Sequence, residues 1–176
     1  PSLAARRPGA ELAAAPGTAA REPRAVILPE LKRFACFADL SDDEREFFAD
    51  AFREVVLDAG EEVFREGEEA DGLLLVLSGR LRLERRAEGL SGEVGAGAAL
   101  GALSLFAPGL REASVFAETQ CRALWLPRAH YRRVADDAPR AACRFVEHLL
   151  ADLVLLVRPG LAHFLRGAVD PSVSEE

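Results

Sequence analysis

The chain has 176 residues, a formal net charge of −7 and 49% hydrophobic residues. This length suits one domain, or one domain with a tail, and the hydrophobic content is sufficient to bury a core, which excludes a globally disordered chain. No stretch reaches the ~18 apolar residues that a membrane span needs. The acidic balance argues against nucleic-acid binding by bulk electrostatics, because phosphates bind to a basic surface.

The negative charge is unevenly distributed along the chain. Residues 41–72 carry 13 carboxylates and 3 arginines, a sum of −10, so the remaining residues sum to +3. A run of this kind indicates a solvated face, with a docking surface for a basic partner as the alternative.

The N-terminal part changes from an irregular to a helical pattern. Residues 1–25 interrupt helix-forming residues with three prolines and indicate a linker or disordered arm. Residues 31–37 predict a short amphipathic turn or helix. Ser41 followed by Glu44 is typical of a capping box, in which each residue bonds the other's backbone N–H, and it predicts a helix that ends near Phe52.

Between Arg53 and Leu126 the pattern becomes one of short apolar runs separated by glycines. Many short strands at such spacing predict an antiparallel sandwich, barrel or jelly roll. The run Leu73–Leu77 does not alternate, which indicates a strand buried on both faces. The expected strands are Val55–Leu57, Val63–Phe64, Leu73–Leu77, Leu81–Leu83, Ala113–Ala117 and Ala123–Leu126.

After Pro127 the pattern is helical again. A short helix is expected at 128–135, and Pro139 is a suitable first residue for a longer helix over 139–158. Apolar residues cover more than one stripe of this longer helix, so it must bury two faces. One face can pack on the β-domain, and a second copy of the helix is the simplest partner for the other. Pro159-Gly160 predicts a break or kink before a short helical turn and a tail.

Cysteine and histidine spacing indicates neither a disulfide framework nor a metal centre. The three cysteines, Cys36, Cys121 and Cys143, are far apart and are expected to be buried or half-buried thiols of a reducing cytosol. The three histidines form no pair at metal-ligand spacing. No signal peptide and no catalytic motif are visible, so a cytoplasmic protein without enzymatic activity is expected.

An ordered set of short motifs resembles the cyclic nucleotide-binding domain, the effector domain of the catabolite activator protein and Fnr family, of cyclic-nucleotide-dependent kinases and of cyclic-nucleotide-gated channels. The resemblance covers about residues 31–158 and implies an antiparallel β-jelly-roll, or double-stranded β-helix: a mainly β fold with N-terminal helices and a long C-terminal helix. The motifs are Asp58–Glu61, Phe64–Glu68, Leu74–Gly79, Gly97–Gly101 and Arg111–Val115.

The resemblance also implies a phosphate-binding cassette between two late strands. In this chain the cassette comprises Gly101, Ala102, Leu103, Ser104, Leu105 and Phe106, then a loop, and then Arg111, Glu112 and Ala113. Independently of the family, a glycine allows close backbone approach, the start of a short helix offers free N–H groups, and an arginine binds phosphate oxygens as a charged fork. Val146 and Leu149 of the long helix are expected to cover the base of the ligand.

Two residues depart from the family pattern. The family has a glutamate after the cassette glycine, where it accepts a hydrogen bond from the ribose 2′-hydroxyl, and Ala102 has no acceptor there. The family has a small or hydroxyl residue after the arginine, where Glu112 brings a charge of the same sign as the phosphate. A lost charge-assisted hydrogen bond costs ~1.5–3 kcal/mol, or ~10–150-fold in affinity. Glu112 could instead pair with Arg111 and replace the anion.

Two hypotheses for function follow. The first is a regulatory sensor module that binds a small anionic ligand, cAMP, cGMP or a relative, and relays its occupancy to a partner or a further domain. The second is a degenerate copy of the fold that binds no nucleotide and acts in dimerisation or protein interaction through the helix at 139–158. Either way the expected divisions are an arm at 1–25, a domain at 26–158 and a tail at 159–176. Because few residues follow this domain, no DNA-binding helix-turn-helix is expected within the chain.

Overall fold

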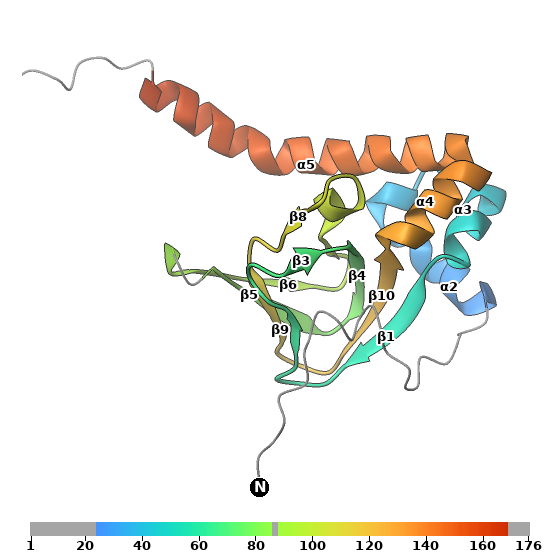
Figure 1. Ribbon diagram of the computed structural model, residues 1–176, viewed down its shortest axis with the longest axis horizontal. Helices are drawn as coiled ribbons and strands as arrows, with labels where there is room; N and C mark the ends of the chain where they lie inside the picture. Colours follow the sequence, from blue (N-terminus) through green and yellow to red (C-terminus); the bar gives the residue numbers. More distant parts are fainter. Residues whose placement is uncertain (1–23, 86–87, 169–176) are drawn as a thin grey trace, which may run out of the picture.

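The computed structural model describes residues 24–85 and 88–168 (Figure 1). Most of the expected N-terminal arm therefore lies outside the described residues, and helix α2 begins at Arg24. The elements in chain order are α2 (Arg24–Leu31), η1 (Ala35–Phe37), α3 (Asp42–Ala49), β1 (Arg53–Leu57), β2 (Glu62–Phe64), β3 (Glu69–Ala70), β4 (Gly72–Ser78), β5 (Arg80–Arg85), β6 (Leu90–Gly95), β7 (Ala99–Leu100), η3 (Ala102–Leu105), β8 (Gly109–Leu110), β9 (Ser114–Ala117), β10 (Cys121–Pro127), α4 (Arg128–Asp137) and α5 (Pro139–Ala168).

The strands form an antiparallel jelly roll with helices at one end. One four-stranded sheet has the order β1-β10-β4-β7 and the other β2-β9-β5-β6, and β3 pairs with β8 in a two-stranded ribbon. The mainly β fold with flanking helices that the sequence predicted is confirmed, and all six expected strands are present. The additional strands β3, β6, β7 and β8 are short or rich in glycine, so their hydropathy gives little signal.

Strand β4 is buried on both faces, as its uninterrupted apolar sequence predicted. Leu73, Leu75 and Leu77 belong to the core beneath the helices, whereas Leu74 and Val76 belong to the interior between the two sheets. Successive side chains of a strand point to opposite faces. The part of the strand that faces both cores, Leu73–Leu77, is therefore apolar at every position.

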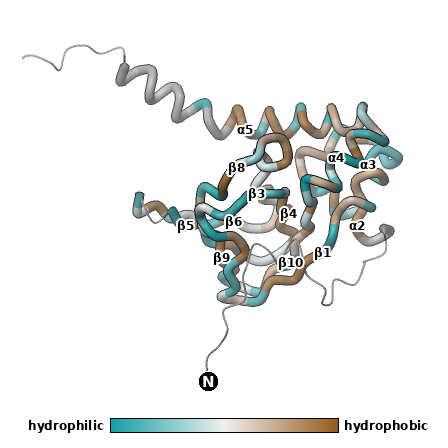
Figure 2. The backbone as a smooth tube through the Cα atoms, viewed as in Figure 1, coloured by the Kyte–Doolittle hydropathy of each residue, from teal (hydrophilic) through white to brown (hydrophobic). Residues whose placement is uncertain are grey.

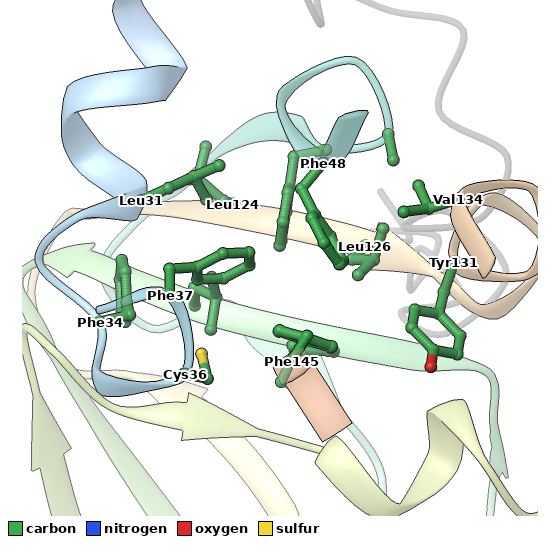
Figure 3. Packing of buried hydrophobic residues seen from close by; sticks show 14 of the residues in the cluster. Leu31, Phe34, Cys36, Phe37, Phe48, Leu124, Leu126, Tyr131, Val134 and Phe145 are labelled. Carbon is green, nitrogen blue, oxygen red and sulfur yellow. The ribbon is translucent and has the colours of Figure 1, made fainter. Parts of the chain in front are cut away.

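The core beneath the helices is built around a cluster of aromatic rings in tilted or edge-on contact (Figure 3). The ring of Phe145 on α5 lies 4.9 Å from that of Phe37 and 4.8 Å from that of Phe48, centroid to centroid. It also lies 5.9 Å from the ring of Tyr131 on α4. The first turns of α5 are thus fixed against the N-terminal helices and α4 together.

Helix α3 begins with the capping box that the sequence predicted. The Ser41 hydroxyl accepts a hydrogen bond from the Glu44 N–H at 3.2 Å, and the Glu44 carboxylate accepts one from the Ser41 N–H at 2.8 Å. The helix ends at Ala49, three residues before the expected end at Phe52.

We expect Ser41→Ala to lower the free energy of unfolding by about 1 kcal/mol, because it leaves a helix N–H without its side-chain acceptor. Urea denaturation measures this effect. Ser91→Ala, at an exposed position of β6, is the control and should leave the midpoint unchanged. An equal change in both variants would contradict a specific role for the cap.

Helix α5 is longer than the sequence predicted. It continues through Pro159 and Gly160 to Ala168, so the expected break after residue 158 is wrong, and the alternative of a kink stays a prediction. A proline removes one i→i−4 hydrogen bond, and a helix can continue past that gap when the flanking turns remain bonded. Figure 1 shows α5 passing across the β-sheets and extending beyond them.

The two faces of α5 differ in what covers them. Phe145 and Leu149 lie in the core, with Leu149 only 2% exposed. Leu150, Val154 and Leu155 are instead 50%, 54% and 66% exposed, which is unusual for large apolar side chains. In Figure 2, α5 runs along the edge of the molecule and contains brown, hydrophobic segments.

The cysteines are free thiols, but one of them is not buried. Cys36 and Cys121 are buried, and burial raises the pKa of the Cys36 thiol to about 12. Cys143 is exposed on α5, which corrects the expectation that all three would be buried or half-buried. No helix in the described part of the chain combines the length and apolar character required to cross a bilayer.

Candidate functional site

The cassette begins at a glycine that no other residue could replace without strain. Gly101 has φ +78°, in the left-handed region, and precedes the 3-10 turn η3. A Cβ there would lie 2.7 Å from the Gly72 carbonyl oxygen and would collide with the Arg111 guanidinium. The first hydrogen bond of the turn runs from Ser104 N–H to Gly101 O, so the N–H groups of Ala102 and Leu103 precede it.

Arg111 lies beside Gly101, as the sequence predicted, and it is deeply buried. Its side chain is 6% exposed, and its guanidinium carbon lies 3.6 Å from the Phe64 ring centroid. Both terminal nitrogens lie 3.5 Å from the Gly72 carbonyl oxygen, at the outer limit of a hydrogen bond. The site therefore holds a buried cation with few and long polar contacts.

Asp71 is the carboxylate nearest to this cation. Its Oδ1 lies 3.8 Å from Arg111 Nη2, and its side chain is 41% exposed. Partial burial raises the pKa of the Asp71 carboxyl, although Arg111 opposes that shift. Burial likewise lowers the pKa of the Arg111 guanidinium, with Asp71 and Glu112 acting in the opposite direction. The charge of each group thus offsets only part of the cost of burying the other.

The two departures from the family pattern occupy different environments. Ala102 is half-buried and packs against the core beneath the helices. Glu112 is exposed, and the ion pair of Arg111 is with Asp71, so the structure does not bring Glu112 into the place of an anion. Leu103 is 54% exposed, and Ala113 is half-buried beside Arg111 in the chain.

Several residues that the sequence did not single out as site residues hold the cassette in place. Ser104 is 4% exposed, and its hydroxyl lies 2.8 Å from the Gly72 carbonyl oxygen and 2.6 Å from that of Gly101. A Cβ on Gly72 would lie 2.6 Å from the Trp125 ring, so only glycine allows this close packing. The sequence offered one signal for these residues, the Asp71-Gly72 pair directly before a strand that is predicted to be buried.

The cassette is attached to α4 by one arginine and one aromatic contact. Arg128, the first residue of α4, donates hydrogen bonds to the carbonyls of Ser104, Ala107 and Ala70. The ring of Phe106 lies 5.5 Å from that of Tyr131 in an edge-on arrangement. A displacement of the cassette would therefore displace the start of α4.

The residues expected to cover a ligand lie on the core side of α5. Leu149 is a core residue, and Val146 is half-buried against the same cluster that Ala102 contacts. Arg111 instead packs on Phe64 and Trp125, whose rings belong to the other core. The structure brings Gly101 and Arg111 together, whereas Val146 and Leu149 lie with Ala102 at the core beneath the helices, and their role in covering a ligand stays a prediction.

The described residues hold no group of three or more His, Cys, Asp or Glu side chains in an arrangement that could bind a metal ion. The binding chemistry of the cassette rests on an arginine, backbone N–H groups and apolar side chains, which suit an organic anion.

Comparisons with known proteins agree with this geometry. The family described as "Cyclic nucleotide-binding domain" matches residues 54–138. The chain therefore contains a domain of the cyclic nucleotide-binding family, and the resemblance stated above is confirmed. The match spans both sheets and the cassette, and it ends one residue before α5 begins.

The proteins that this chain resembles include transcriptional regulators. The chain is 33% identical over 115 residues to a CRP-like cAMP-activated global transcriptional regulator of Mycobacterium tuberculosis, which is 57% of this chain and 51% of that protein. Its structure resembles the N-terminal domain of a transcriptional regulator from Streptomyces coelicolor, with 28% identity, a TM-score of 0.66 and coverage of 82% and 99%. It also resembles Thermus thermophilus Catabolite Activator Protein, with 25% identity, a TM-score of 0.64 and coverage of 74% and 62%. The chain spans about half the length of the curated regulator it matches.

Proposed function

We propose that this chain is a regulatory sensor module whose cassette binds a small anionic ligand, a cyclic nucleotide or a close relative. The observation that carries the proposal is the state of Arg111. A guanidinium that is 6% exposed retains several donors, yet its polar contacts are long, at 3.5 and 3.8 Å. An anion bound beside Gly101 would supply the acceptors that the protein does not.

The route by which occupancy would be relayed runs through α4 to α5. Arg128 and Phe106 connect the cassette to α4, and Tyr131 continues the contact to Phe145 on α5. A ligand that moves the cassette would change the packing of Phe145, and α5 would carry the change beyond the β-domain to a partner. Only a ligand that binds the two arrangements with different affinity would shift their populations. In this proposal the protein acts in the cytoplasm, without catalysis and without binding DNA through the described domain.

The second candidate is a copy of the fold that has lost its nucleotide and serves dimerisation or protein interaction. Ala102 favours it, because an alanine cannot accept the ribose hydrogen bond. The exposed apolar side chains of α5 are consistent with this candidate, because such a surface is typical of an interaction site whether or not a ligand binds.

Thermal unfolding with a panel of cyclic mononucleotides and dinucleotides at millimolar concentration separates the two candidates. Ligand present at 100 times its Kd adds ~2.7 kcal/mol to the free energy of unfolding. The sensor proposal expects at least one nucleotide to raise the midpoint, and Arg111→Ala to remove that rise. If no member of the panel raises the midpoint, the cyclic-nucleotide form of the proposal fails.

We also propose that the chain forms a homodimer through α5. Leu150, Val154 and Leu155, rather than the core residue Leu149, supply the exposed apolar surface. We expect Leu150→Asp with Val154→Asp to give a monomer in light scattering, because charges cannot be buried unpaired at an interface. Arg140→Asp, at an exposed position at the start of α5, is the control and should keep the dimer. A wild-type monomer, or a dimer in the double variant, would contradict this interface.

A further inference from the structure

A basic hollow lies outside the cassette, where the start of β1 meets the start of α4. Strand β1 pairs antiparallel with β10, with Arg53 opposite Trp125, and α4 follows β10 directly. This pairing brings Arg53 beside residues that are distant in the sequence. The hollow has a volume of about 410 Å³ and is lined by Arg53, Asp71, Pro127, Arg128, Ala129, His130 and Arg132.

The side chains around the hollow carry an excess of positive charge. Three guanidinium groups face one carboxylate, that of Asp71, in a chain whose formal net charge is −7. Asp71 is itself drawn toward Arg111 at 3.8 Å. Within residues 24–85 and 88–168, no ion pair joins Arg53 or Arg132 to a carboxylate, and both side chains are exposed to solvent. Other exposed arginines, such as Arg65 with Glu62, do form an ion pair with a carboxylate.

His130 orders the wall of the hollow. Its Nδ1 lies 2.9 Å from the Ala51 carbonyl oxygen, which can only accept, so Nδ1 carries the hydrogen and donates it. Its Nε2 is then free to accept a hydrogen bond from Arg53 Nη2 at 3.5 Å. The imidazole thereby directs the Arg53 guanidinium toward the hollow.

Arg128 lines the hollow and is held in place by the backbone. It is half-buried, and its Nε and Nη2 donate hydrogen bonds to the carbonyls of Ser104, Ala107 and Ala70, which fix its charge without neutralising it. A fixed, half-buried charge beside the exposed arginines Arg53 and Arg132 suits an anion that is charged at one end and solvated at the other.

We propose that this hollow, defined by Arg53, Arg128, His130 and Arg132, is a second binding site for a small phosphate-bearing molecule. Its volume falls within the range of ~300–1,000 Å³ typical of small-molecule sites. The planar forks of the arginines match phosphate oxygens in geometry as well as in charge. The site does not rest on the function proposed for the cassette, because none of these four residues is a proposed ligand of the cassette.

Titration of pyrophosphate into the full chain at low ionic strength, followed by calorimetry, tests the proposal. We expect saturable binding with one site per chain, weakened by about tenfold or more in Arg53→Gln with Arg132→Gln. Arg133→Gln is the matched control, because it lies next to Arg132 on α4, is equally exposed and does not line the hollow. It should bind as the wild type does, and added salt should weaken both.

Three results would overturn the proposal. One is the absence of saturable pyrophosphate binding, and another is an equal loss in the control. The third is a loss in Arg111→Ala that the Arg53/Arg132 variant does not share, which would assign the anion to the cassette.

A polyglutamate peptide, titrated in parallel, should bind no more tightly than pyrophosphate. A peptide that binds where pyrophosphate does not would assign the hollow to an acidic protein partner. Because Arg53 and Arg132 are exposed, melting temperatures equal to wild type are expected and confirm that the variants fold.

Discussion

Ala102→Glu combined with Glu112→Ser should raise the affinity of the cassette for cAMP or cGMP by about 10- to 150-fold. A carboxylate at position 102 would supply the acceptor for the ribose 2′-hydroxyl that the family pattern has and this chain lacks. One charge-assisted hydrogen bond of this kind contributes ~1.5–3 kcal/mol, which converts to that range of affinity. Isothermal calorimetry on the wild type and the variant measures the gain.

The two single variants should contribute unequally. Glu112 is exposed and outside the ion pair of Arg111, so water screens its repulsion of a phosphate, and Glu112→Ser alone should have a small effect. Ala102→Glu should therefore give most of the gain. Because Ala102 also packs against the core beneath the helices, its glutamate must turn toward Gly101 and away from that core.

Adding Arg111→Ala to the double variant is the control that ties the gain to the cassette. Without the guanidinium the new affinity should disappear, because the phosphate would lose its charged partner. A gain that survives in the triple variant would show that the nucleotide binds elsewhere. No gain in the double variant would mean that the cassette is closed to nucleotides for reasons other than these two residues, and it would favour the interaction module.

The fold could be predicted from the sequence because its strongest signals are local. The uniform apolar run at Leu73–Leu77 requires a strand covered on both faces, and β4 is such a strand. The Ser41 and Glu44 pair fixes a helix start within one turn. Strand β6 escaped prediction because its sequence, Leu90–Gly95, contains two glycines and is exposed or half-exposed, so burial leaves no mark on it.

The site could be predicted only in part, because its remaining members meet through long-range pairing. Gly101 and Arg111 belong to one loop and could be identified together. Asp71 and Gly72 reach Arg111 because β3 pairs with β8, and Arg128 arrives from the far end of β10. No spacing in the chain encodes those contacts.

The long helix illustrates a different limit of the sequence analysis. A helix that is apolar around most of its circumference does not reveal which stripe meets the core. The structure sets the phase through Phe145 and Leu149, four residues apart, and turns Leu150 and Val154 outward.

Arg111→Met should leave the unliganded protein as stable as the wild type or more stable, while it abolishes nucleotide binding. Burial removes water from the Arg111 guanidinium, and its long contacts replace that hydration only in part. Replacing a buried ion pair by apolar side chains of similar volume is often neutral or stabilising by about 1–4 kcal/mol, and here the partner Asp71 is 41% exposed, so the substitution leaves no fully buried charge behind. Methionine would keep the packing on Phe64 and Trp125, whose rings lie 3.6 and 5.8 Å from the guanidinium carbon. Asp71 would retain the nearby charge of Arg128 and 41% exposure of its side chain to water.

Urea denaturation against pH measures the outcome and distinguishes a binding residue from a structural one. In the wild type, partial burial raises the pKa of the Asp71 carboxyl above its ordinary value of 3.8, so the folded chain retains this proton to higher pH than the unfolded chain does. The contribution of Asp71 to stability therefore declines as the pH rises from the pKa of this carboxyl in the unfolded chain to its higher pKa in the folded chain. Arg111 lowers the pKa of Asp71, so its removal raises the pKa of Asp71 in the folded chain further. The variant should therefore lose more stability between acid and neutral pH than the wild type. Stability that falls by several kcal/mol at every pH would instead show that Arg111 holds the fold together, and the sensor proposal would lose the observation on which it rests.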